Sequence, residues 1–69
     1  MARDFLRAAK VFEHIRAFPE AAGLYEQGGD FASAGRCHEQ AGERLKAAAA
    51  YDRGKRPDLA LKLYHAAGN

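Results

Sequence analysis

Residues 21–34 read AAGLYEQGGDFASA, and this stretch sets the pattern of the whole chain. Its first alanine and its tyrosine belong to two columns of residues that recur every 13 positions without an insertion. The alanine column consists of Ala8, Ala21, Ala34, Ala47 and Ala60. The aromatic column consists of Phe12, Tyr25, His38, Tyr51 and Tyr64. A short, fixed period of this kind is typical of a repeat array.

The spacing within each unit predicts one short α-helix followed by a turn. The alanine and aromatic positions lie four residues apart, with further apolar positions three residues to either side, so all of them share one helix face. Gly28, Gly29 and Gly42 fit helix C-termini, where a positive φ is needed. Pro19 and Pro57 fit first helical turns, and Asp4 and Asp30 fit N-caps.

We therefore expect an all-α fold of five short antiparallel helices stacked as an α-solenoid, because such short connections make successive helices neighbours. The predicted helices lie near residues 4–16, 19–27, 31–41, 44–53 and 57–67.

Two stretches carry a resemblance to a known group: residues 21–34, and residues 47–69, which read AAAAYDRGKRPDLALKLYHAAGN. They resemble tetratricopeptide-like α-solenoids, above all the helical hairpins of intraflagellar-transport, coatomer and clathrin-related proteins. The resemblance spans nearly the whole chain, from Asp4 to Gly68, and implies a binding array rather than an enzyme. The unit is shorter than the ~17 residues per helix of a tetratricopeptide repeat. Groove shape and ligand-binding residues therefore do not carry over from that group.

Length and composition set further bounds. The chain has 69 residues and fits one helical-repeat domain, 1–69, which is either a whole array or a segment of a longer one. Its net charge of +2 is too small to indicate nucleic-acid binding by itself. Cys37 is the single cysteine, so no internal disulfide forms. We see no signal peptide and no apolar run of membrane-spanning length, and expect a cytoplasmic location.

Several residues could belong to a catalytic or metal site, but a structural role explains each of them more simply. Cys37 and His38 occupy apolar positions of the unit and are expected to fill the core. The three histidines, His14, His38 and His65, lack the paired spacing of a zinc site. The acidic column, Glu13, Glu26, Glu39 and Asp52, is expected on the solvent side in ordinary surface pairing, with Glu13 and Glu39 three residues after Lys10 and Arg36. We therefore expect no catalytic residue, no metal and no cofactor.

One charge pattern follows the 26-residue hairpin period rather than the 13-residue unit. Lys10, Arg36 and Lys62 lie on the odd-numbered helices, where the even-numbered helices carry Gly23 and Ala49. The predicted partner-binding row consists of Arg7, Lys10, His14, Arg36 and Lys62. Such a row suits an acidic peptide or a phosphate backbone, whereas neutralisation by Glu13 and Glu39 would make it an ordinary solvated face.

The function favoured by the sequence is a protein–protein interaction or scaffolding module. The alternatives are nucleic-acid or acidic-ligand binding through the basic row, and a designed or consensus array without a natural ligand. Helices at the two ends of a stack lack one neighbour each, so we also expect self-association, as a closed dimer in preference to an open polymer. The apolar residues expected to mediate it are Leu6, Ile15, Leu59 and Leu61.

Overall fold

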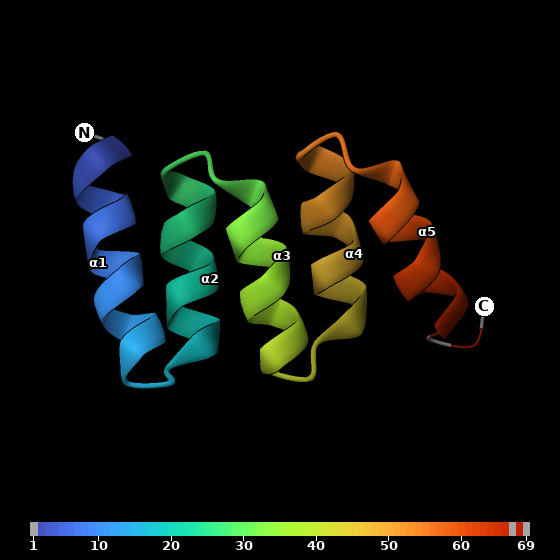
Figure 1. Ribbon diagram of the computed structural model, residues 1–69, viewed down its shortest axis with the longest axis horizontal. Helices are drawn as coiled ribbons and strands as arrows, with labels where there is room; N and C mark the ends of the chain where they lie inside the picture. Colours follow the sequence, from blue (N-terminus) through green and yellow to red (C-terminus); the bar gives the residue numbers. More distant parts are fainter. Residues whose placement is uncertain (1, 67, 69) are drawn as a thin grey trace.

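The computed structural model describes residues 2–66 and 68, and these form five α-helices in a single row (Figure 1). The helices are α1 (Ala2–His14), α2 (Phe18–Gln27), α3 (Phe31–Gln40), α4 (Arg44–Arg53) and α5 (Pro57–Ala66). Each helix runs antiparallel to the next and packs chiefly against its neighbours in the chain, so α1 and α5 form the two ends. The predicted all-α class, the number of helices and their order are confirmed.

The observed helix ends lie within two residues of the predicted ones. Asp30 is the N-cap of α3, because its carboxylate accepts a hydrogen bond from the backbone N–H of Ser33 at 3.2 Å. The prediction that Asp4 is an N-cap is wrong: α1 begins at Ala2, and Asp4 lies inside its first turn. There its negative charge still complements the helix dipole. Residue 67, the predicted end of the last helix, lies outside the described residues.

The chain reverses direction by the same backbone device after every helix. One residue in each turn has a positive φ: Arg16 at 65°, Gly29 at 84°, Gly42 at 79°, Lys55 at 62° and Gly68 at 89°. We call this set the turn column, and its members lie 13 residues apart. The next backbone N–H then bonds the carbonyl of the aromatic column, as from Asp30 to Tyr25 at 2.8 Å and from Glu43 to His38 at 2.8 Å. The left-handed residue also donates its own N–H to the carbonyl three residues before it, as from Gly29 to Glu26 at 3.0 Å, and the two bonds together form the Schellman motif.

Arg16 and Lys55 hold this left-handed conformation although they carry a Cβ atom. We predict that Lys55→Gly raises the free energy of unfolding by ~1 kcal/mol, because glycine adopts a positive φ without the steric cost. Lys10→Gly is the matched control, since Lys10 is exposed in the middle of α1 and glycine costs ~1 kcal/mol within a helix. Urea unfolding followed by circular dichroism measures both changes. A loss of stability in Lys55→Gly would contradict the assigned turn.

Close approach of neighbouring helices depends on a column of small residues that the sequence analysis did not single out. Its members are Ala9, Ala22, Gly35 and Ala48, and all four are buried. At Gly35 the ring of Tyr51 lies so near that an added Cβ would stand 2.7 Å from the ring carbon Cε1. Tyr51 of α4 therefore packs on Gly35 of α3.

The core consists of two groups of buried residues. The larger spans α1 to α4, with Leu6, Phe12, Phe18 and Leu24 packed against it; its buried members are Ala9, Ala21, Ala22, Tyr25, Ala34, Cys37 and Ala50. The smaller joins α4 to α5 through Ala47, Ala48, Tyr51 and Ala60, with Leu59 and Leu63 packed against it. Most of the buried residues in both groups are alanines, so the helices approach one another closely.

Two glycines inside helices allow a direct test of this packing. We predict that Gly35→Ala destabilises the protein because its methyl group clashes with the Tyr51 ring. Gly23→Ala should instead stabilise it by ~0.5–1 kcal/mol, because nothing lies within 4 Å of an added Cβ there and alanine favours the helix. Thermal unfolding of the two variants gives the comparison. Equal stabilisation of both would mean that Tyr51 does not pack on Gly35.

Candidate functional site

The acidic column pairs with the aromatic column of the next helix. Tyr25 donates its hydroxyl hydrogen to Glu13 Oε1 at 2.7 Å, and Tyr51 donates to Glu39 Oε1 at 2.6 Å. His38 Nε2 lies 3.5 Å from Glu26 Oε2 in the same relation. Each partner lies 12 residues after the acid, so the two columns tie one helix to the next.

These contacts correct the expectation that the acids pair with bases on their own helix. Glu13 also accepts a hydrogen bond from Arg36 Nη2 at 2.7 Å, an ion pair that connects α1 to α3 across α2. Arg36 lies 23 residues after Glu13, and Lys62 lies at the same distance in sequence after Glu39. Glu13 thus joins three helices, and its first task is structural.

These contacts change the pKa of the two buried tyrosines. Burial, together with the hydrogen bond to a carboxylate, raises the pKa of Tyr25 and of Tyr51 from 10.0 to about 12. A raised pKa means that the folded state resists ionisation of the phenol more strongly than the unfolded state does.

We predict alkaline unfolding driven by these two tyrosines. Because their folded-state pKa values exceed the unfolded value of 10.0, their contribution to stability is complete below pH 10 and is lost as the pH rises towards 12. The double variant Tyr25→Phe, Tyr51→Phe should lose stability less steeply over that range. Denaturant unfolding at pH 8 to 11.5 measures the slopes. Parallel pH profiles for the variant and the wild-type protein would contradict the assignment.

His38 is buried, as expected for a core position, yet its surroundings are not apolar. Besides Glu26 of α2, Glu43 lies at the start of α4 with its Oε1 3.2 Å from His38 Nδ1. The hydrogen bond from His38, with a second from Lys46, lowers the pKa of Glu43. Two carboxylates therefore hold this imidazole where α2, α3 and α4 meet.

Cys37 does not have the environment of a nucleophile. Its side chain is fully buried, and burial raises the pKa of its thiol. A reactive cysteine needs a lowered pKa and access to its substrate. Cys37 is therefore a core residue, in agreement with its place in the unit.

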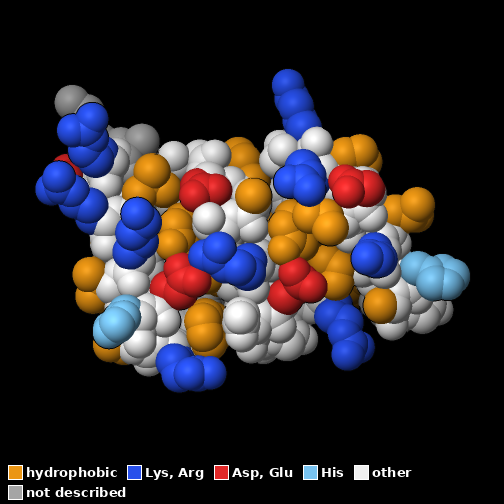
Figure 2. All heavy atoms as spheres, viewed as in Figure 1, with side chains coloured by type: hydrophobic (Ala, Val, Ile, Leu, Met, Phe, Trp, Pro, Cys, Tyr) orange, Lys and Arg blue, Asp and Glu red, His pale blue; other side chains and the backbone are white. Residues whose placement is uncertain are grey.

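The predicted partner-binding row is interleaved with acids. Arg7, Lys10, His14, Arg36 and Lys62 are all exposed. Figure 2 shows basic and acidic side chains alternating across the middle of the row. Glu13 forms an ion pair with Arg36, and Glu39 of α3 accepts a hydrogen bond from the Tyr51 hydroxyl of α4. The row therefore lacks the continuous positive charge that a phosphate backbone attracts.

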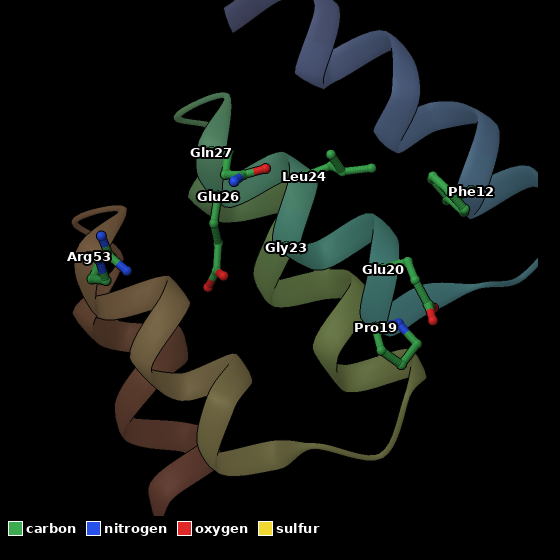
Figure 3. Close-up of a pocket in the computed structure, with 8 residues that line it drawn as sticks. All are labelled: Phe12, Pro19, Glu20, Gly23, Leu24, Glu26, Gln27 and Arg53. Atoms are coloured by element: carbon green, nitrogen blue, oxygen red, sulfur yellow. The ribbon is translucent and has the colours of Figure 1, made fainter.

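A different surface contains a broad, solvent-open hollow. This hollow of about 740 Å³ lies over α1 and α2 and reaches towards α4 (Figure 3). It is lined by Phe12, Pro19, Glu20, Gly23, Leu24, Glu26, Gln27 and Arg53, and we call it the α2 hollow. Gly23 leaves the middle of α2 uncovered. In the sequence, Gly23 is distinguished only as an uncharged residue at a position where the odd-numbered helices carry a base.

The α2 hollow combines apolar and charged walls. Phe12 and Leu24 lie together at one side, between α1 and α2 (Figure 3). Glu26 points across the opening towards the helix that carries Arg53 (Figure 3). Arg53 is held in place by stacking over the Phe31 ring, with 4.7 Å between its Cζ and the ring centroid. This arrangement offers an apolar contact, carboxylate acceptors and one fixed guanidinium.

The residues expected to mediate self-association are divided by the structure. Leu6 and Leu59 are half-buried and pack against the two core groups. Ile15 and Leu61 are 64% and 70% exposed. Only Ile15 and Leu61 therefore stand free for a contact with another chain.

Two further features of the described residues concern metal binding and membrane insertion. No group of three or more His, Cys, Asp or Glu side chains among the described residues is placed to hold a metal ion. None of the described helices combines the length and apolar composition of a bilayer-spanning segment. Comparison with protein-family models, with curated proteins and with solved structures gave no match. The resemblance to tetratricopeptide-like solenoids therefore stays an expectation from the residues alone.

Proposed function

We propose that this chain is a protein-binding module and that it binds a peptide segment in the α2 hollow. The observation that carries the proposal is the opening itself. Gly23 occupies a position that carries Lys10, Arg36 and Lys62 on the odd-numbered helices, and it leaves room there for a ligand. Binding sites in proteins are concave and combine apolar walls with a few polar groups.

The lining suggests the chemistry of the bound peptide. An apolar side chain would contact Phe12 and Leu24, where the hollow borders α1. A lysine or arginine of the peptide would lie near Glu20 and Glu26, on either side of Gly23 along α2, where it would share the Glu26 carboxylate with His38 at 3.5 Å. The preferred ligand is therefore a peptide that carries a basic residue close to a large apolar one.

The basic row supports a second function less well. Its charges alternate with Glu13 and Glu39, and Arg36 already has a carboxylate partner within the chain. A nucleic acid would have to displace that pair before it gained the contact, so we favour peptide binding. A binding function also agrees with the raised pKa and full burial of Cys37, which leave that thiol without a catalytic role.

A displayed library of random peptides tests the proposal, with bound sequences then synthesised and measured by fluorescence polarisation. We predict enrichment of peptides with a basic residue near an aromatic or aliphatic one. Gly23→Trp should weaken their binding at least about tenfold, because the indole would fill the hollow. Its added Cβ meets no atom within 4 Å, so the helix itself tolerates the change.

Ala49→Trp is the matched control. Ala49 holds the position in α4 that Gly23 holds in α2, and it is exposed but does not line the hollow. Its affinity for the peptides should stay within about twofold of the wild type. Enrichment of no peptide, or equal loss in both tryptophan variants, would show that the α2 hollow is not the binding site. A salt-dependent DNA titration with micromolar affinity would favour the basic row instead.

A further inference from the structure

The outer face of α5 differs from the corresponding face of every other helix. On α1 to α4 the residue at one recurring position is small and buried: Ala9, Ala22, Gly35 and Ala48. The residue at the same place in α5 is Leu61, which is 70% exposed. A shallow hollow of about 440 Å³ borders it, between Asp58 and His65. No described residue of another helix lines this hollow.

This face is not built to receive another helix of the same kind. At the interface of α3 with α4 the Tyr51 ring packs on Gly35, and an added Cβ there would already stand 2.7 Å from the ring. Leu61 fills that space. His65 also replaces the acid that accepts the tyrosine hydroxyl at Glu13 and Glu39. A ligand of the outer α5 face must therefore have a different pattern of side chains.

The outer face of α5 has a pattern that complements itself. Asp58, Leu61 and His65 lie on one stripe of the helix, with the acid one turn before the leucine and the imidazole one turn after it. When two copies of such a stripe meet antiparallel, leucine meets leucine and each acid meets the imidazole of the other copy. An imidazole N–H can donate to a carboxylate whether or not the ring is charged.

We infer that the outer face of α5 binds the same face of a second copy, related by a two-fold axis through the Leu61 pair. Such a contact is isologous and closes as a dimer. Asp58 is available for it, because its contact with Arg56 is long, at 3.8 Å, and solvent-exposed. The contact lies away from the α2 hollow, so dimer formation is independent of the proposed peptide site.

The opposite end of the row is a poorer partner. Val11 and Ile15 are exposed on α1, but the bases Arg7, Lys10 and Arg16 surround them. Two α1 faces would bring these bases together, whereas an α1 face against α5 would bring them near Asp58 as well as Lys62. Like charges that face each other across an interface oppose binding. Charge repulsion therefore disfavours a contact of α1 with α1, and the pairing of Asp58 with His65 favours α5 with α5.

The dimer is weak, because one helix face covers far less than the roughly 1,200–2,000 Å² buried in stable complexes. We expect association in the range of hundreds of micromolar. Sedimentation equilibrium over that range should therefore detect a monomer–dimer equilibrium of the complete chain.

Two single substitutions separate the possible contacts. Leu61→Lys should abolish the dimer, since it removes the apolar centre and adds two facing cations. Val11→Lys, at the other end of the row and 63% exposed, should leave the dimer intact. Loss of the dimer in Val11→Lys alone, or in both variants, would overturn the inference in favour of an α1 or a head-to-tail contact. A strict monomer of the wild-type chain would overturn it outright.

A charge exchange tests the antiparallel pairing itself. Asp58→Lys removes the acceptor of the imidazole N–H, and His65→Glu places two carboxylates opposite one another, so each should weaken association about threefold to fivefold. The double variant pairs a cation with an anion again, so it should return to within about twofold of the wild type. Additive weakening in the double variant would exclude the proposed pairing. Circular dichroism of each variant confirms that α5 remains folded.

Discussion

The fold depends on one backbone requirement, a left-handed residue after every helix. That residue lets the next N–H bond back to the carbonyl of the aromatic column, as Asp30 does to Tyr25 and Arg56 does to Tyr51. The same aromatic residues supply the side chains that pack on, or bond to, the preceding helix. One residue thus closes the turn with its backbone and the interface with its side chain. This double task keeps the two features in fixed register and explains why the period holds without an insertion.

The helices could be predicted because their ends depend on local signals. Glycine at a positive φ, proline in a first turn and aspartate at an N-cap act within a few residues of themselves. Asp4 shows the limit of that reasoning, since aspartate is equally favourable at a cap and inside the first turn. Arg16 and Lys55 show a second limit. Their residue types give no sign of a left-handed backbone, and only their place in the turn column indicates it.

The side-chain network could not be predicted in the same way, because it depends on how neighbouring helices are rotated. Rules for residues three or four apart describe contacts within one helix, and they assigned the acidic column to solvent. The rotation is set by close approach at the small-residue column, which brings Tyr51 over Gly35 and its hydroxyl to Glu39. His38 shows the same dependence. Its burial follows from its column, whereas its contacts with Glu26 and Glu43 come from two other elements.

The columns build the fold, and departures from them give the surface its individual features. A perfectly regular array would present the same side chains at every helix, so it would have no single place for a partner. Gly23 replaces a base and opens the α2 hollow, Leu61 replaces a small buried residue, and His65 replaces an acid. Residues at the regularly repeating positions already make contacts within the chain, as Glu13 does with Tyr25 and Arg36. For that reason recognition is to be sought at the irregular positions of this chain rather than along its regular basic row.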